Sequence, residues 1–479
     1  MRKFKNTHYL RNFLTHQRLL YSTKANRLIS ITQHVRRPWH GWKPLSVVVS
    51  THNTQIIHPT SNEQGPFFKR WRVKEGISAA FLPKNYQTSV TPEYWGFTRW
   101  QFIQNVTGAL TGVLSTQSLL YAIGLGVGSI PLAATLNWVI RDGLGQLGGV
   151  IYASFISDRF DSEPKRYRFH ASIAMQLASL LEMLTPLWPG AFLPLASISN
   201  IAKNMAWIAS SATRAQMHKS FMLRDNLGDI TGKAGSQSTA AGLIGTGFGI
   251  LISAAITTTS SLPIFCHSAF TSQPLTGLFT AFLPFSVLTL YANYKSSLYV
   301  ITPTLNITRA ELVFWQVLTH FSPTKRVLNA KEMEQIIPEP REIAMTEPFI
   351  KSFRTPFPVP IRVQPPLDIT PSVSELTSIL LQQTFSEPEH YYIHSTSHEV
   401  RIWYDDHASS SDLVKGFFHA CVIRVWGCRN NCEEQMKELH RWVNSVYPMI
   451  EHGLVVRKWD LYTLFLIENE QGRLLVKEL

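Results

Sequence analysis

Two long stretches of this 479-residue chain contain no charged side chain, and they constrain the fold more than any other feature. No Lys, Arg, Asp or Glu lies between Arg99 and Arg141, and none lies between Lys233 and Lys295. Each stretch has room for two segments of the roughly 20 apolar residues that cross a hydrocarbon core as a helix. Backbone inside a bilayer must satisfy its hydrogen bonds within the segment, so helices are the structure expected here.

Further apolar segments lie between these two stretches, and the sequence predicts five to seven membrane helices between residues 100 and 295. The segments are residues 102–140, which read as two helices separated near Gly126, and residues 143–157, 171–193, 194–213 and 234–294. The piece at 143–157 is short for a full crossing, so we expect a re-entrant or tightly packed helix there. A soluble bundle of unusually apolar helices stays open as the alternative.

Glycines spaced four residues apart favour the membrane interpretation. This spacing lets two membrane helices approach closely, whereas each glycine inside a soluble helix costs about 1 kcal/mol relative to alanine. The pairs are Gly108 and Gly112, Gly124 and Gly128, Gly145 and Gly149, and Gly245 and Gly249. We therefore expect such glycines at helix contacts.

The net charge of +13 comes from the leading segment of the chain. Residues 1–90 hold 15 of the 45 Lys and Arg and two of the 32 acidic residues, which leaves 30 of each kind for the rest. A neutral body argues against a nucleic-acid-binding surface, because such surfaces need clustered positive charge. The four Cys are widely spaced and do not suggest a disulfide framework.

The leading segment has the composition of an organellar presequence. No acidic residue precedes Glu63, and apolar side chains between residues 9 and 21 can share one helical face opposite Arg11 and Arg18. We predict a mitochondrial presequence within residues 1–70 that is cleaved after residue 20. A plastid transit peptide replaces it if the host is a plant, and a disordered basic tail remains the alternative.

Polar side chains interrupt the apolar region at two places and form the candidate binding site. The residues are Asn137, Arg141 and Asp142, and then Asp225, Asn226, Asp229, Lys233 and Gln237. Charges at membrane depth are costly unless they are paired or face a wet cavity. Asp229 and Lys233 are four residues apart with the acid first, which favours an ion pair on a helix. Helix breaks that bring both clusters around a cavity are one interpretation, and interfacial loops that anchor helix ends are the other.

Several long motifs in this region resemble the root UVB sensitive (RUS) family. They include WGFTRWQFIQNVTGALTGVLSTQSLL, AATLNWVIRDGLGQLGG, ATRAQMHKSF and DNLGDITGKAGSQSTAAGLIG, in this order between Trp95 and Ile252. The resemblance extends over roughly residues 90–320. It implies a multi-pass or membrane-associated protein without an agreed catalytic reaction, from a family whose plant members are linked to plastids, auxin transport and pyridoxal-phosphate homeostasis. Gln146 and His170 depart from the residues common in the family.

Common catalytic and metal-binding signatures are not found in the sequence. Residues 228–233 resemble a phosphate loop, but the spacing of the glycines is wrong and Ala234 follows the lysine where Ser or Thr is needed. Cys428 and Cys432 with the nearby histidines match no common zinc module. We therefore predict no enzymatic activity, no bound cofactor and no metal site.

The composition changes after Lys295, where a helix is expected over residues 309–321 and a proline-rich connector follows. The last hundred residues suggest strands at 391–394, 400–404, 461–467 and 474–476, with helices at 412–426 and 433–446. The predicted fold class is thus mainly α, a multi-pass transmembrane helical bundle with a small C-terminal α+β domain. The domains are a basic presequence (1–70), a pre-membrane segment (71–99), the transmembrane domain (100–330), a proline-rich linker (331–375) and the C-terminal domain (376–479).

Two functions are compatible with this organisation. The first is a carrier or transporter for a small metabolite or cofactor, because glycine-rich helix breaks near charged residues are common at transporter sites. The second is a membrane-anchored scaffold that recruits other proteins. The expected partners are the lipid bilayer and another copy or another member of the RUS family, and we expect no nucleic acid.

Overall fold

A computed structural model of the chain describes residues 29–37, 41–49, 54–57, 79–122, 132–156, 159–259, 274–320, 330–350, 359–365, 389–396, 398–427 and 433–466. It divides into two compact units, Met1–Ser78 and Ala79–Leu479. The candidate functional site lies in the second unit.

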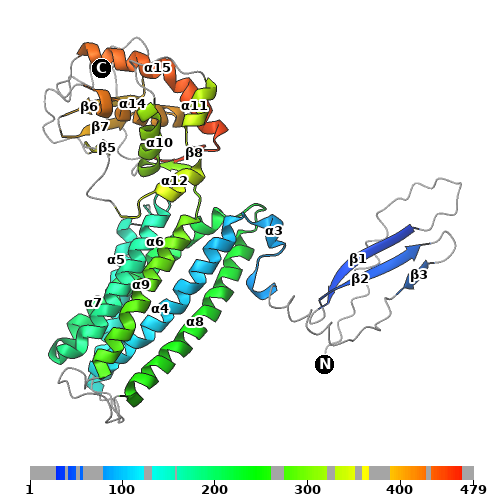
Figure 1. The fold of residues 1–479 in the computed structure, drawn as a ribbon, viewed down its shortest axis with the longest axis vertical. Coiled ribbons are helices and arrows are strands. Elements are labelled where there is room, and N and C mark those ends of the chain that lie inside the picture. Colours follow the sequence, from blue (N-terminus) through cyan, green and yellow to red (C-terminus); the bar gives the residue numbers. More distant parts are fainter. Residues whose placement is uncertain are drawn as a thin grey trace. The chain divides into compact units, whose positions relative to one another are not determined.

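The first unit contains an antiparallel sheet of three strands in the order β1-β2-β3. The strands are β1 (Ile29–Arg37), β2 (Gly41–Val49) and β3 (Thr54–Ile57) (Figure 1). They lie within the stretch assigned to a presequence, whose cleavage stays a prediction. The helical face expected between residues 9 and 21 lies outside the described residues.

The second unit begins with a bundle of long helices (Figure 1). Its helices are α3 (Tyr86–Ser89), α4 (Glu93–Ala122), α5 (Leu132–Ile156), α6 (Pro164–Leu184), α7 (Phe192–Lys219), α8 (Leu227–Thr259) and α9 (Pro274–Leu298), with short 3₁₀ turns at Thr185–Leu187 and Pro189–Ala191. Helix α4 packs against α6, α8 and α9, and α7 packs against α5 and α6. The sequence prediction of a mainly helical protein is confirmed.

The number of membrane spans is only partly supported. Among the described residues, two helices are long and apolar enough to cross a bilayer, namely Leu227–Ile256 in α8 and Leu275–Leu298 in α9. The separate short helix expected at residues 143–157 is wrong, because α5 runs without a break from Leu132 to Ile156. The sequence analysis placed a helix end at Arg141 and Asp142. In the structure Arg141 pairs with Glu182 on α6 and Asp142 accepts from Asn200 on α7, so these charges do not break α5.

Two of the glycine pairs lie at close helix contacts, as expected. A Cβ atom at Gly145 would lie 2.4 Å from Asn200 Nδ2 on α7, and one at Gly149 would lie 2.8 Å from Ile208. A Cβ atom at Gly245 would lie 2.1 Å from the carbonyl oxygen of Val106 on α4. These helices approach so closely that only glycine fits, which is the use of such pairs in membrane helices. Gly124 and Gly128 lie outside the described residues.

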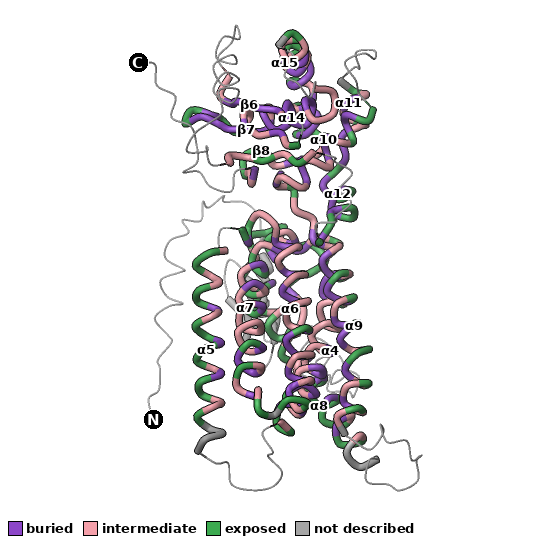
Figure 2. Tube along the Cα trace, turned by 90° about the vertical axis from the view of Figure 1, so that its left-hand side faces the viewer, coloured by how far each residue is buried: buried purple, intermediate pink, exposed green. Residues whose placement is uncertain are grey.

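Exposed residues line the outer sides of several bundle helices (Figure 2), and many of them are large and apolar. On α5 the side chain of Phe155 is 79% exposed, and on α8 that of Leu243 is 72% exposed. Val150 and Leu147 on α5 and Leu251 on α8 are also exposed. Soluble monomers rarely expose apolar surface that is contiguous over several helices.

The C-terminal region forms a smaller α+β unit, as the sequence predicted. Its sheet has the order β5-β7-β6, and a second pair joins β4 to β8 in parallel. The strands are β4 (Thr304–Asn306), β5 (Ile361–Val363), β6 (Tyr391–Ser395), β7 (Val400–Tyr404) and β8 (Asp460–Phe465), and the helices are α10 (Ile307–His320), α11 (Ala330–Ile336), α12 (Pro340–Thr346), α14 (Ser410–Trp426) and α15 (Glu433–Val456). Helix α14 is buried between the sheet and the neighbouring helices, where Gly416 contacts Tyr391 and Tyr404.

Residues 331–350, which the sequence assigned to an extended linker, instead form α11 and α12 and are packed. The side chains of Ile337 and Ile343 are buried in the core of the C-terminal region. Pro340 stands in the first turn of α12, where its missing N–H costs nothing. The prolines thus begin a helix here instead of preventing one.

A buried cluster of charges connects this segment to the bundle. Glu347 Oε2 lies 3.1 Å from Lys165 Nζ at the start of α6, and its Oε1 lies 3.0 Å from Arg309 Nε on α10. Lys165 Nζ also donates to the carbonyl oxygen of Ala344. All three charged side chains are buried, so each needs the opposite charge of its partner to offset the cost of leaving water.

Candidate functional site

The residues predicted to form one polar site fall into two separate clusters. Asn137, Arg141 and Asp142 lie on α5, whereas the other five lie just before α8 or in its first three turns. No hydrogen bond or ion pair joins the two sets within the described part of the chain. The two clusters have to be considered individually.

The first cluster is an ion-pair network between three helices. Arg141 Nη2 on α5 lies 3.4 Å from Glu182 Oε1 on α6, and Lys203 Nζ on α7 donates to Glu182 Oε2. Asn200 Nδ2 donates to Asp142 Oδ1 at 3.1 Å. The side chain of Glu182 is 1% exposed, so both cations compensate a buried carboxylate. This cluster contains partners, Glu182 and Lys203, that the sequence did not connect with Arg141.

The second cluster attaches the segment before α3 to α8. Asp229 Oδ2 accepts from the backbone N–H of Lys84 at 2.6 Å, and Lys233 Nζ donates to the carbonyl oxygen of Ala79. Gln237 Nε2 donates to the carbonyl oxygen of Phe81 at 2.6 Å. The ion pair expected between Asp229 and Lys233 is not found among the described residues, because both side chains bind this neighbouring backbone. The interpretation as an anchor describes this cluster better than a shared cavity does.

Asp225 and Asn226 form the turn that precedes α8. Asp225 adopts a left-handed backbone conformation with φ of 44°, which Asp tolerates better than most residues. The carbonyl oxygen of Asn226 accepts from the N–H of Ile230 in the first turn of α8. The side-chain amide of Asn226 is buried and has no hydrogen-bond partner among the described residues.

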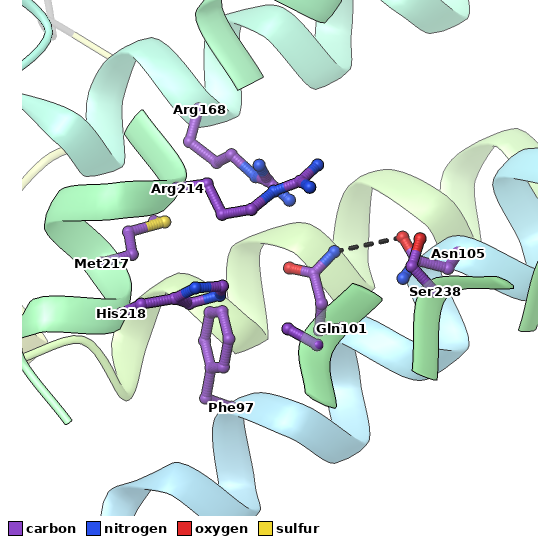
Figure 3. A pocket seen from close by; sticks show the side chains of 9 residues that line it. Phe97, Gln101, Asn105, Arg168, Arg214, Met217, His218 and Ser238 are labelled. Atoms are coloured by element: carbon purple, nitrogen blue, oxygen red, sulfur yellow. Dashed lines mark hydrogen bonds between the residues drawn. The ribbon is translucent and has the colours of Figure 1, made fainter. Parts of the chain in front are cut away.

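A pocket between α4, α6, α7 and α8 lies at the end of the bundle where α4 and α8 begin (Figure 3). Its empty volume is about 370 Å³, part of which is open to solvent. The lining residues are Phe97, Gln101 and Asn105 of α4, Arg168 of α6, Arg214, Met217 and His218 of α7, and Ala234 and Ser238 of α8. Figure 3 shows the two guanidinium groups side by side, with Gln101 and His218 directed to the same space.

The charge of this pocket is not compensated by the protein. Arg168 is buried, and its Nη1 donates to the carbonyl oxygen of Ser210 at 2.6 Å. Arg214 lies near enough that the two like charges repel. Within the described residues no carboxylate forms an ion pair with either arginine. Arg168 is buried whereas Arg214 is exposed. A buried charge is normally paired, so Arg168 lacks an anion.

Neutral polar groups complete the surroundings of the arginines. Gln101 Nε2 donates to Asn105 Oδ1 at 3.2 Å and to Gln104 Oε1 at 2.8 Å, while Gln101 Oε1 is buried without a partner in the described chain. His218 Nδ1 lies 3.1 Å from the hydroxyl of Thr231, and its ring contacts Phe97 edge-on. Two guanidinium groups, with the Asn105 amide and the Ser238 hydroxyl in the same lining, suit a small anion that carries phosphate or carboxylate. Phe97 and Met217 offer an apolar side to the same ligand.

The sequence alone did not single out the arginines of this pocket. Arg168 lies in KRYRF, and Arg214 lies in ATRAQMHKSF, one of the motifs that resemble the RUS family. Arg168 is also the first of several polar residues, spaced three or four apart, that end at Glu182. That spacing puts them on one face of a helix and could have indicated a buried polar side of α6.

No group of three or more His, Cys, Asp or Glu that could hold a metal occurs among the described residues. Cys428 and Cys432 lie outside them. His419 in α14 is buried, and burial lowers the pKa of its ring to about 3, so the ring is neutral.

Comparison with known proteins agrees with the position of this pocket in the chain. The family model described as "Vitamin B6 photo-protection and homoeostasis domain" matches residues 69–320, which include every pocket residue. The chain is 28% identical to "Protein root UVB sensitive 3" of Arabidopsis thaliana over 390 residues, covering 80% of this chain and 82% of that protein. No solved structure matches the chain.

Two further relatives have a higher identity over shorter alignments. "RUS family member 1" of Dictyostelium discoideum is 34% identical over 236 residues, which cover 49% of this chain and 42% of the relative. "Protein root UVB sensitive 2, chloroplastic" of Arabidopsis thaliana is 38% identical over 186 residues, which cover 39% of this chain and 42% of that protein. Because the family model matches more than half of the chain, and these relatives bear the same family name, the chain belongs to the root UVB sensitive family.

Proposed function

We propose that this RUS protein is integral to a membrane, binds a small anionic metabolite in the arginine pocket, and carries it across the bilayer. The observation that carries the proposal is the buried Arg168 beside Arg214, without a carboxylate partner in the described chain. Leaving a charge buried and unpaired destabilises a protein unless a ligand compensates it. A buried arginine whose charge the fold does not neutralise is expected at a binding site.

The exposed apolar surface of the bundle supports the membrane part of the proposal. Helices α8 and α9 have the length and composition of membrane spans, and α5 exposes a row of large apolar side chains that includes Val150 and Phe155. Apolar surface of this kind suits lipid or a second RUS protein as its partner. Resistance to alkaline carbonate extraction tests this part, and recovery of the chain in the aqueous fraction would contradict it.

The family description suggests which anion to test first. Vitamin B6 occurs in phosphorylated forms that combine a phosphate dianion with an aromatic ring, and the pocket offers arginines beside Phe97 and Met217. We therefore choose pyridoxal 5′-phosphate as the first ligand and pyridoxal, which lacks the phosphate, as its comparison. A scaffold without transport activity is the competing function, and it predicts no binding of either compound.

Binding is measured by calorimetry on the full chain purified in detergent. Loss of one charge-assisted contact is worth about 1.5–3 kcal/mol, so Arg168→Gln should weaken binding of pyridoxal 5′-phosphate roughly 10-fold to 150-fold. Arg224→Gln removes an exposed arginine outside the pocket and should leave the affinity unchanged. Competition by inorganic phosphate distinguishes pocket binding from Schiff-base formation with surface lysines.

Equal affinity for pyridoxal and its phosphate, or equal loss in both arginine variants, would refute the arginine pocket as the binding site. Transport is then tested by uptake of the phosphate ester into vesicles that contain the purified chain. Binding without uptake would support a receptor instead of a carrier, whereas a scaffold predicts no binding.

An organellar location is part of the same proposal. The name of one Arabidopsis relative describes that protein as chloroplastic. The leading basic segment of this chain has a composition that suits import into an organelle. Mitochondrial import remains a prediction. N-terminal sequencing of protein from isolated organelles checks it, and an intact Met1 on the membrane-inserted protein would contradict cleavage.

A further inference from the structure

A buried polar face of α6 connects the arginine pocket with the ion-pair network of Arg141, Glu182 and Lys203. Arg168 and Glu182 lie 14 positions apart on this helix, which corresponds to about 21 Å at 1.5 Å per residue. The side chains between them on the same face are Ser172, Gln176 and Ser179, spaced three or four residues apart, and all are buried. An α6 that only filled a core would carry apolar residues at these positions.

Polar groups of α4 accompany this face. Ser115 and Ser118 of α4 are fully buried, and Ser118 Oγ donates to the carbonyl oxygen of Met183 on α6 at 3.0 Å. Gln176 Oε1 is buried and has no hydrogen-bond partner among the described residues. A buried amide oxygen without a partner is costly and indicates a place where water or a ligand is bound in another state.

The ion-pair network at the far end has the composition of an anion site that is already occupied. Two cations on different helices, Arg141 of α5 and Lys203 of α7, each contact one oxygen of the Glu182 carboxylate. Arg141 also lies over the ring of Trp138, and its Nε has no hydrogen-bond partner in the described chain. The pocket end therefore has two arginines without a carboxylate. This end has two cations with the buried Glu182 and with Asp142, a half-exposed carboxylate that lies 3.7 Å from Arg141.

We propose that Arg141 and Lys203 form a second anion site, and that the Glu182 carboxylate occupies it until a phosphate-bearing or carboxylate-bearing ligand takes its place. The ligand enters at Arg168 and Arg214, moves along the polar face of α6, and exchanges with Glu182. This inference rests on the proposed function, because it describes the route of the anion that enters the arginine pocket. It goes beyond the proposed function by assigning a second binding site.

Inorganic phosphate is the probe, and equilibrium dialysis of the full chain in detergent gives the number bound per chain. Wild type should bind one phosphate, in the arginine pocket. Glu182→Gln removes the internal anion and should bind two. Glu182→Gln combined with Lys203→Gln removes one of the two cations and should return to one. Glu163→Gln breaks a pair outside both sites and serves as the matched control.

Stability offers a second measurement, because Glu182→Gln leaves Lys203 without a carboxylate and leaves Arg141 with Asp142 alone, at 3.7 Å. Phosphate should raise the melting temperature of this variant more than that of wild type, and this extra stabilisation should disappear in the double variant. One phosphate per chain in all variants, with no extra stabilisation of Glu182→Gln, would overturn the second site. If Glu182→Gln is not recovered folded, vesicle uptake by Gln176→Leu decides the question.

Gln176→Leu removes an unpartnered polar group from the face and should keep pocket binding while it lowers uptake at least tenfold. Unchanged uptake by this variant would overturn the route along α6. Failure of the proposed function gives a different result, namely no phosphate binding that depends on Arg168 in any variant. A third result is also distinct: phosphate binding depends on Arg168, every variant binds one phosphate, and Gln176→Leu has normal uptake. This result would refute the second site and the route along α6 but not the proposed function.

Discussion

Removing the carboxylate of Glu347 should detach the C-terminal region from the bundle more effectively than any exposed change. Glu347 is 7% exposed and lies between Lys165 and Arg309, whose side chains are 1% and 2% exposed. Glu347→Gln keeps the shape and leaves two buried cations without a carboxylate counterion. Breaking one side of a buried ion pair costs about 3–5 kcal/mol. At about 2–4 °C per kcal/mol the apparent melting temperature should fall by roughly 6–20 °C.

The assay is thermal unfolding of the full chain in detergent, followed by tryptophan fluorescence and by protease accessibility between α9 and α10. Arg341→Gln is the matched control, because Arg341 pairs with Glu93 from α12 to α4 but is 65% exposed. An exposed pair contributes about 0–1 kcal/mol, so this variant should melt within a few degrees of wild type. Equal melting temperatures for both variants would refute the buried cluster as the connection.

Three further predictions concern other parts of the described chain. Burial raises the pKa of Cys421 to about 12, so a variant with Cys421 as its only cysteine should resist alkylation at pH 8 until it is unfolded. Hydrogen bonding to Asp405 raises the pKa of His390. The stability that this contact contributes is therefore full below the unfolded pKa of about 6.5 and is lost as the pH rises through the folded pKa. NMR titration of the His390 ring checks the raised pKa, and Asp405→Asn should abolish this shift. Gly245→Ala should cost about 1–3 kcal/mol by forcing α8 from α4, whereas Gly242→Ala, with no atom within 4 Å of the new Cβ, should be neutral or stabilising in the same melting assay.

The helices of the bundle were predictable because their apolar segments are long and the intervening polar residues are few. The sequence placed a boundary at Arg141, however, since a charge in an apolar run usually marks a helix end. Helix α5 stays continuous because Arg141 forms an ion pair with Glu182, which lies 41 residues later in the chain. A contact over that sequence distance has no local signature.

The candidate site was harder to predict for a related physical reason. Asp229 and Lys233 have the spacing of an ion pair, but both bind the backbone before α3, which competes for the same groups. Arg168 and Arg214 gave no pattern by themselves, because a buried arginine without a partner is recognisable only after its surroundings are known. Composition identified the charges, and only packing showed which of them lacks a counterion.

The glycine contacts described for α5 with α7 and for α8 with α4 have a mechanical consequence. Each contact locks two helices of one half of the bundle, α5 to α7 on one side and α4 to α8 on the other. Arg168 and Arg214 belong to the first half, while Gln101 and Ser238 belong to the second, so the pocket lies in the seam. For the proposed carrier, this arrangement predicts that the glycine-contacting pairs move as rigid units and that the pocket opens and closes at the seam between them.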